Sequence, residues 1–366
     1  MRMYSSQNVY DAALERIRYL FDEFPNVIAN VSGGKDSTVI FNLAMKVAKE
    51  KNRLPLKVLF IDQEAEWEAT IDQIKDIMYN PDVEPLWYQI PLKLFNATSQ
   101  KDHWLHCWEE GKEWIREKDP ISIKENHYDC DRFAKLFTAI TDKDYKNIKT
   151  CYLSGVRCEE SPARLWGLTG QLTYKDITWG RVENKKLNHY AFHPIYDWSY
   201  TDVWKAIENN NWSYCKLYDY MYQYGIPIQQ MRVSNVHHET AIRSLFFLQE
   251  VEPDNWNRIV KRIDGISTAG QLGKDEFFIK DLPFMFGNWK EYRDYLLENL
   301  IKEENRKIFK KMFIQMDKDI KHLMDISNNN YKSMYKTQIG IIATNDIYGT
   351  KFGNWRVAMK MKAGSR

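Results

Sequence analysis

One short segment combines flexible backbone, a cation, a carboxylate and hydroxyl groups: residues 32–37 read Ser-Gly-Gly-Lys-Asp-Ser. The apolar run before it, residues 27–31, predicts a short buried strand, and residues 38–49 have the spacing of an amphipathic helix. Glycines let backbone amides close around a ligand, and a helix N-terminus adds unpaired N–H groups and a positive dipole end. We therefore expect a polyanion-binding turn, with an ordinary glycine turn as the alternative. The residues expected to bind the anion are Ser32, Gly33, Gly34, Lys35, Asp36 and Ser37.

A second segment, residues 155–164, reads Gly-x-Arg-x-x-Glu-Ser-x-x-Arg. Arg157 and Arg164 lie seven residues apart across an expected turn. The planar guanidinium suits a bidentate grip on a phosphate, sulfate or carboxylate group. Glu160 lies between the two arginines and is expected to orient one of them. The pattern predicts a site for the anionic part of a second substrate, and the alternative is an ordinary pair of surface arginines.

The elements that must position these segments predict an α/β protein. Helical spacing over residues 8–24 precedes the first strand. Besides residues 27–31, the expected strands are residues 55–62, 87–90 and 150–154. Strands that alternate with helices form a doubly wound parallel sheet, which binds ligands at the carboxyl ends of its strands. Asp62 and Gly155 fall at such ends, so we expect both beside the loop.

Together with two further segments, these motifs resemble a known enzyme family. The loop matches the pyrophosphate loop of ATP pyrophosphatases, S-G-G-x-D-S, and not the Walker loop, which has four residues between its first Gly and the Gly-Lys pair. Residues 193–204 contain P-I-x-D-W-x-x-x-D-V-W. Residues 60–70 are similar to D-T-G-x-x-F-x-x-T, keeping Asp62 and Thr70. In this order they resemble the phosphoadenosine-phosphosulfate (PAPS) reductase family over about residues 8–235, which implies an adenine nucleotide alpha hydrolase-like fold.

The cysteine content departs from that family. Sulfonucleotide reduction there needs a nucleophilic cysteine near the C-terminus, and the adenylylsulfate branch adds paired cysteines for an iron–sulfur cluster. In this chain no cysteine follows residue 215, and none shows Cys-Cys or Cys-x-x-Cys spacing. We therefore expect neither sulfonucleotide reduction nor an iron–sulfur cluster. The chain resembles instead the branch without redox cysteines, which is typically bacterial or phage-encoded and often occurs with a ParB-like partner.

The resemblance implies ATP and Mg²⁺ as the ligands of the site. The loop amides and Lys35 would hold the β- and γ-phosphates, while Asp36 and Asp62 would position Mg²⁺, which favours carboxylate and phosphate oxygens. Such a site stabilises charge on departing pyrophosphate and leaves the α-phosphorus open to attack. The product would be an adenylylated acceptor, or AMP where water attacks. The expected catalytic residues are Lys35, Asp36, Asp62, Arg157, Glu160 and Arg164, and Gly155 is expected to complete the nucleotide site.

Three functions from different classes remain open. The first is an ATP pyrophosphatase-type nucleotidyltransferase that adenylylates or activates an acceptor, which would release pyrophosphate and AMP. The second is a sulfonucleotide-handling enzyme, either a PAPS reductase or an ATP sulfurylase-like protein; the latter would show sulfate-dependent exchange of pyrophosphate into ATP. The third is a non-catalytic ATP-binding regulator that acts with a ParB-like protein, which would bind the nucleotide without turnover.

Beyond about residue 236 the pattern becomes mainly helical and more basic. We therefore expect a nucleotide-binding catalytic domain over residues 1–235 and a helical, basic extension over residues 236–366. From Tyr331 to Arg366 basic and aromatic residues alternate, and Asp346 is the only acidic residue. This pattern is typical of a nucleic-acid or acidic-partner surface, and a solvated tail is the alternative. Gly349 and Gly353 predict a loop within it.

The overall composition is ordinary for a globular enzyme, with 44% hydrophobic residues, 28% charged residues and a net charge of +2. Residues 1–7 lack the apolar core of a signal peptide, and no apolar stretch approaches membrane-spanning length. The five cysteines lack paired spacing, which favours a reducing compartment. We expect a cytoplasmic protein that does not bind membranes. The 13 Trp and 22 Tyr residues leave an oligomer open.

Overall fold

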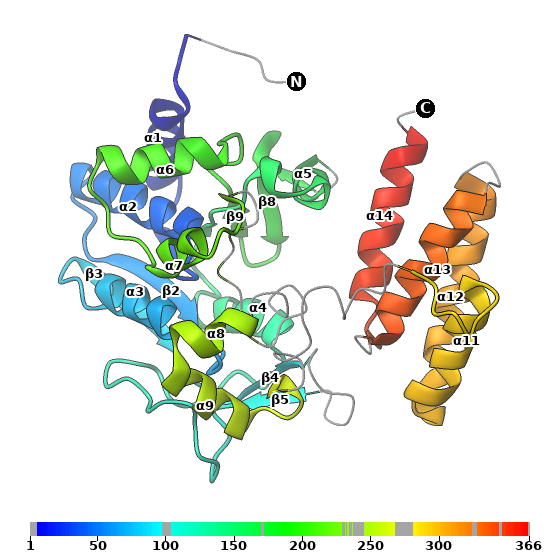
Figure 1. Ribbon diagram of the computed structural model, residues 1–366. Helices are drawn as coiled ribbons and strands as arrows, with labels where there is room; N and C mark the ends of the chain where they lie inside the picture. Colours follow the sequence, from blue (N-terminus) through cyan, green and yellow to red (C-terminus); the bar gives the residue numbers. More distant parts are fainter. Residues whose placement is uncertain are drawn as a thin grey trace. The chain divides into compact units, whose positions relative to one another are not determined.

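The structure, a computed structural model, divides into two compact units (Figure 1). The first unit comprises Met1–Leu94, Leu105–Asn235 and Val251–Arg262, and the second comprises Phe95–Trp104, Val236–Glu250 and Ile263–Arg366. The domain boundary expected at residue 236 stays a prediction, because compactness does not establish which stretches fold alone. The described residues are 6–96, 104–169, 172–228, 231, 233, 236, 245–267, 281–323, 328–343 and 346–364.

The first unit is built on a seven-stranded, mostly parallel sheet with the order β3-β2-β1-β6-β9-β8-β7. The first five strands in this order pair in parallel, and β8 and β7 continue the sheet in antiparallel fashion. The chain moves outward from β1 to β3 and then returns to the other side of β1 with β6. This reversal places a topological switch point between the carboxyl ends of β1 and β6. The strands are β1 (Asn26–Asn30), β2 (Leu56–Ile61), β3 (Val83–Tyr88), β6 (Thr150–Leu153), β7 (Thr173–Tyr174), β8 (Ile177–Asn184) and β9 (His189–Phe192).

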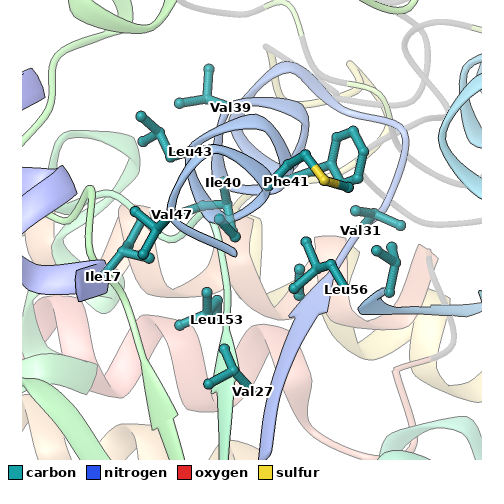
Figure 2. Packing of buried hydrophobic residues seen from close by; sticks show 14 of the residues in the cluster. Ile17, Val27, Val31, Val39, Ile40, Phe41, Leu43, Val47, Leu56 and Leu153 are labelled. Carbon is teal, nitrogen blue, oxygen red and sulfur yellow. The ribbon is translucent and has the colours of Figure 1, made fainter. Parts of the chain in front are cut away.

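One hydrophobic core joins a face of this sheet to four helices. Figure 2 shows part of this core, with strand residues such as Val27 and helix residues such as Val39. Val27 of β1 and Leu153 of β6 point into it, because side chains alternate between the two faces of a strand. In the helix after the loop, Val39, Leu43 and Val47 are fully buried at the four-residue spacing of one helix face. The four helices are α1 (Val9–Glu23), α2 (Lys35–Glu50), α3 (Glu68–Met78) and α6 (Tyr200–Asn209).

On the opposite face of the sheet, Tyr152 of β6 packs edge-on against Phe137, with ring centroids 4.9 Å apart. Phe137 belongs to α4 (Phe133–Asp144), and α5 (Pro162–Thr169) contacts β8 near the same region. The remaining described elements outside the C-terminal helices are a two-stranded sheet of β4 (Leu92–Phe95) and β5 (Trp104–Cys107), a 3₁₀ turn (Cys158–Glu160), α7 (Leu217–Gln223), α8 (Leu245–Val251) and α9 (Pro253–Arg262).

The second unit is mainly helical. Phe309, Phe313, Met316 and Ile320 follow helical spacing along one helix and are buried in a separate hydrophobic cluster. Its described helices beyond residue 280 are α11 (Trp289–Leu300), α12 (Glu303–Leu323), α13 (Asn328–Ala343) and α14 (Thr350–Gly364). The chain is thus an α/β protein with a doubly wound, mostly parallel sheet and a helical C-terminal region, as predicted.

The basic C-terminal stretch differs from its prediction in one respect. Gly349 has a φ of +72° and precedes α14, but Gly353 lies within that helix, so the expected loop is shorter than the glycine pair suggested. Met359 of α14 is buried in the helical cluster, which anchors the stretch; Arg366 lies outside the described residues. Of the helices that the structure describes, none has the length and apolar composition needed to cross a membrane.

Candidate active site

The loop of residues 32–37 joins β1 to the first turn of α2. Gly33 has a φ of +72°, and a Cβ at this position would lie 2.6 Å from Cγ2 of Thr70. Gly34 has a φ of −77°, and a Cβ there would meet no atom closer than 3.4 Å. The fold therefore requires glycine at position 33 but not at position 34. Gly34 also gives α2 no side-chain cap, which leaves its N-terminus suited to an anion.

Hydroxyl groups hold the loop in its conformation. Oγ of Ser37 accepts a hydrogen bond from the Ser32 amide at 3.1 Å and donates one to the Gly34 carbonyl at 2.9 Å. The Lys35 amide donates to the hydroxyl of Tyr218 at 3.1 Å, and the Lys35 ammonium lies 5.4 Å from the Tyr218 ring centroid. Burial raises the pKa of Tyr218 far above its ordinary value, so this hydroxyl keeps its proton. Tyr218 was not predicted as a site residue.

Asp36 connects the loop to the arginine segment. One of its carboxylate oxygens lies 2.9 Å from the Lys35 ammonium, and the other lies 2.5 Å from Nε of Arg157. The Arg157 side chain is 5% exposed and also donates to the Trp198 carbonyl at 3.3 Å. A Cβ at Gly155 would lie 2.6 Å from the carbonyl carbon of Asp36. The structure thus brings both motifs together, and its geometry favours a positioning role for Arg157 over the predicted grip on a second substrate.

The other arginine of the motif has a different environment. The Arg164 side chain is 50% exposed, and its Nε lies 3.3 Å from a carboxylate oxygen of Glu160. The second carboxylate oxygen of Glu160 lies 3.9 Å from Nη2 of Arg157. Glu160 therefore lies between the two guanidinium groups, and only Arg164 has a substantial surface open to a ligand. Their predicted catalytic roles stay predictions.

Asp62 at the end of β2 is fully buried and surrounded by donors. Its Oδ2 accepts hydrogen bonds from Trp87 Nε1 at 3.0 Å and Gln89 Nε2 at 2.9 Å. Its Oδ1 accepts from the Glu64 amide at 2.9 Å and from the Arg116 guanidinium. This environment supports a structural role and does not fit the predicted role as a magnesium ligand.

The predicted metal site as a whole receives no support from the donor groups. Both oxygens of Asp36 face cations, and both oxygens of Asp62 face hydrogen-bond donors. Within the described part of the chain, no cluster of three or more His, Cys, Asp or Glu side chains is placed to bind a metal ion. A Mg²⁺ ion held by Asp36 and Asp62 therefore stays a prediction that this geometry does not favour.

A pocket of about 360 Å³ lies at the carboxyl ends of β1, β6 and β9. This is the switch point of the sheet, the position at which open α/β sheets bind ligands. Apart from Arg164, none of its polar side chains was predicted as a site residue. Asn30 is the last residue of β1 and Ser154 directly follows β6, and this position at a strand end is the sequence signal that marks them. The polar lining residues are Asn30, Tyr152, Ser154, Arg164, Arg181, Glu183 and His193.

His193 contributes a neutral group to this pocket. Its Nδ1 lies 2.6 Å from Oγ of Ser154, within hydrogen-bond distance. Burial lowers the pKa of His193 to about 3, and the nearby charges of Arg181 and Arg164 act in the same direction. The imidazole is therefore uncharged at neutral pH and does not serve as a proton donor in its cationic form.

The chain is similar to several known proteins. The chain is 29% identical over 309 residues to the uncharacterized protein YbdN of Escherichia coli (strain K12), which covers 80% of this chain and 75% of YbdN. Among solved structures, Candida glabrata FMN adenylyltransferase in complex with FMN and the ATP analog AMPCPP shares 15% identity, with a TM-score of 0.38. That match covers 60% of this chain and 65%, somewhat under two thirds, of the other.

Candida auris PAPS reductase, in a phosphate complex, shares 14% identity with a TM-score of 0.34, over 65% of this chain and 98% of the other. A domain of unknown function (DUF3440) matches residues 225–354. The phosphoadenosine phosphosulfate reductase domain matches residues 26–224, more than half of the chain. The chain therefore belongs to the phosphoadenosine phosphosulfate reductase domain family.

Proposed function

We propose that the chain is an ATP pyrophosphatase-type enzyme that transfers the adenylyl group of ATP to an acceptor and releases pyrophosphate. The observation that carries this proposal is the uncapped N-terminus of α2, entered through the left-handed turn at Gly33. The Lys35 ammonium and the amides of the first turn of α2 belong to this N-terminus, which offers a polyphosphate positive charge and N–H donors. Membership of the PAPS reductase domain family supports an adenine nucleotide as the ligand.

The proposed reaction is one displacement at phosphorus. An acceptor oxygen forms a bond to the α-phosphorus of ATP while the bond from that phosphorus to the α–β bridging oxygen breaks. The bonding electron pair leaves with pyrophosphate. The loop amides and Lys35 stabilise the negative charge that develops on this leaving group, because they are held in place before the reaction. Asp36 keeps Lys35 and Arg157 in position through its two ion pairs.

The cysteines give the competing reductase function little support. Burial raises the pKa of Cys215 to about 11, and it also raises the pKa values of the Cys107 and Cys151 thiols. These thiols keep their protons at neutral pH, whereas attack on sulfur requires a thiolate. Partial burial also raises the pKa of the Cys158 thiol.

A labelled-nucleotide experiment tests the proposal. We expect ATP labelled at the α-phosphate to yield AMP or an adenylylated product, together with pyrophosphate. Sulfate-dependent exchange of pyrophosphate into ATP would select an ATP sulfurylase-like enzyme instead. Nucleotide binding without any product would select a regulator.

The loop itself is tested by substitution. Gly33→Ala should weaken binding of a non-hydrolysable ATP analogue in calorimetric titration, since alanine strains the left-handed backbone and collides with Thr70. Gly353→Ala is the matched control, because a Cβ there meets no atom within 4 Å. Equal affinities in the two variants would reject this loop as the nucleotide site.

The partners of the enzyme are proposals with separate support. A ParB-like protein follows from the family resemblance alone. Nucleic acid is suggested by the basic helical unit, in which residues 281–366 include 16 Lys and Arg against 10 Asp and Glu. A cytoplasmic location is proposed from the free cysteines, none of which forms a disulfide.

A further inference from the structure

We propose that the pocket at the switch point binds the acceptor, and that this acceptor is a small organic anion carrying a hydrogen-bond donor. The role of this anion as the acceptor rests on the proposed function, whereas its binding in the pocket does not. Three observations support the proposal: two buried polar atoms of the lining residues without a hydrogen-bond partner, two arginines, and an apolar wall.

Two polar atoms in the pocket are buried without a hydrogen-bond partner. They are the hydroxyl of Tyr152, a residue only 1% exposed, and Oδ1 of Asn30. Thr141 is a polar neighbour of the Tyr152 hydroxyl, but the Thr141 hydroxyl donates to the Thr138 carbonyl at 3.0 Å. Buried polar groups are nearly always satisfied, because leaving one unpaired costs the desolvation of that group. Tyr152 comes from β6 and Asn30 from β1, so the two lie on the strands that flank the switch point. Both atoms are enclosed by protein, so a ligand at the switch point would satisfy them only where their side chains turn toward it.

Two arginines make the pocket attractive to an anion. Nε of Arg181 donates a hydrogen bond to Glu183. Among the described residues, the two terminal nitrogens of the Arg181 guanidinium have no acceptor. Arg164 contributes a second guanidinium with a single ion pair, to Glu160. Both charges act on the same neutral imidazole, that of His193, which places them around one space. Guanidinium groups hold carboxylate or phosphate oxygens in fixed geometry.

The remaining wall indicates an organic molecule and not an inorganic oxyanion. Phe137, Val156 and Leu168 line the pocket beside the polar groups. Its volume of about 360 Å³ falls in the range of small-molecule sites, about 300–1,000 Å³. Sulfate or inorganic phosphate would leave most of this apolar surface without contact. A carboxylate or phosphate on an apolar body fits both parts of the lining.

An anionic acceptor also matches the proton chemistry of the pocket. A carboxylate or phosphate oxygen attacks phosphorus without losing a proton, whereas a neutral hydroxyl acceptor needs a general base. Among the described lining residues, Glu183 is paired with Arg181, and Nδ1 of His193 faces Ser154. Neutral His193 keeps one ring nitrogen that can accept a proton, but an anionic acceptor does not require this base.

Calorimetric titration without nucleotide tests the binding. The probes are benzoate, 4-hydroxybenzoate, phenyl phosphate and inorganic sulfate. We expect at least one aryl anion to bind tenfold more tightly than sulfate, and Arg181→Gln to weaken that binding at least tenfold. Arg18→Gln is the control, since Arg18 forms a comparable ion pair with Glu50 on the surface of α1. The affinity of this variant for the aryl anion should stay within twofold of the wild-type value.

Arg181→Gln also leaves Glu183 without its partner, so the double variant Arg181→Gln, Glu183→Gln serves as a second test. It should fold with an unchanged circular dichroism spectrum and still bind the aryl anion at least tenfold more weakly. Aryl anions that bind no better than sulfate, or equal affinity in the Arg181 and Arg18 variants, would overturn the proposal. Arg181-dependent anion binding without ATP cleavage would reject only the proposed reaction. Cleavage with anion binding that is independent of Arg181 would reject only this pocket.

Discussion

Gly155 defines how closely the two motifs of the site approach. A Cβ there would lie 2.6 Å from the carbonyl carbon of Asp36 and 2.9 Å from the Ser37 amide nitrogen. Both are backbone atoms at the start of α2, so they cannot move away as a side chain would. We expect Gly155→Ala to lower the free energy of unfolding by about 1–3 kcal/mol and to weaken binding of an ATP analogue. Urea unfolding and calorimetry check this, and stability like that of Gly353→Ala would contradict it.

The Tyr152 hydroxyl should contribute little to the free energy of unfolding. Since it is buried without a partner, Tyr152→Phe should leave the free energy of unfolding unchanged or raise it. Tyr174→Phe is the contrasting variant, because the Tyr174 hydroxyl donates to Glu23 at 2.6 Å; its loss should cost about 0.5–1.5 kcal/mol. Denaturant unfolding of both variants provides the measurement. A cost for Tyr152→Phe as large as that for Tyr174→Phe would show that its hydroxyl has a partner in the folded state.

Glu66 predicts a pH dependence of stability. Burial, with the neighbouring charge of Asp62, raises the pKa of Glu66 to about 8. The folded protein then binds one proton more than the unfolded chain between about pH 4.5 and 8. Stability should therefore fall as pH rises through this window, by up to about 1.4 kcal/mol per pH unit. In Glu66→Gln this contribution should vanish, and parallel unfolding curves for both proteins from pH 5 to 8 would contradict the assignment.

At the residue scale the sequence located the loop but not the groups that surround it. The need for glycine at position 33 and the proximity of Gly155 to the loop follow from local pattern and strand order. The partners of Asp62 could not be predicted in this way. Trp87 and Arg116 come from separate segments, and no periodicity in the sequence indicates that they contact the same carboxylate. For the same reason Arg157 looked like a ligand-binding group, whereas tertiary contacts bury it against Asp36.

At the scale of elements, α3 begins without a local cap. Trp67 occupies its N-cap position, and the carboxylate of Glu252 supplies the acceptor, bonding the Glu68 amide at 2.8 Å and the Ala69 amide at 3.0 Å. A carboxylate at a helix N-terminus satisfies free amides and complements the helix dipole. Sequence pattern could not predict this cap, because it lies 184 residues from the helix.

We expect Glu252→Ala to lower the free energy of unfolding by about 1–2 kcal/mol, because two amides of α3 lose their acceptor. Glu117→Ala is the control, since Glu117 is exposed, and its effect should stay within about 0.5 kcal/mol. Thermal and urea unfolding measure both. Similar values for the two variants would mean that water replaces the cap without cost.

The strands show the same division between local and distant information. The central strands β1, β2 and β6 were predicted nearly to their ends, because buried parallel strands form continuous apolar runs. The edge strand β3 begins at Val83, whereas the sequence predicted a strand only from residue 87. Pro85 argued against an earlier start, but proline is tolerated in an edge strand. β8 mixes polar and apolar residues and has a register shift near Val182, so its hydrophobic pattern did not predict a strand.

At the scale of the whole molecule, the even balance of 52 basic and 50 acidic residues hides a local surplus. The surplus lies in the helical unit, where α12 carries exposed lysines at helical spacing along one face. No ion pair involving them occurs among the described residues. Removing the residues after Tyr348 would not isolate this feature, because it would also delete Met359 and uncover the hydrophobic cluster. The lysines of this stripe are Lys307, Lys311, Lys318 and Lys321.

Charge substitution along this stripe gives the sharper test of nucleic-acid binding. The stripe spans about 21 Å at 1.5 Å per residue, which is long enough to follow several phosphates. Replacing its four lysines with glutamine should weaken binding to double-stranded DNA and reduce the slope of log affinity against log salt by up to about four. A control variant removes the same charge from the first unit by replacing Lys112, Lys185, Lys186 and Lys205. Equal salt slopes in the two variants would place nucleic-acid binding elsewhere, and a full-length protein without salt-dependent retention on DNA would remove nucleic acid as the partner of α12.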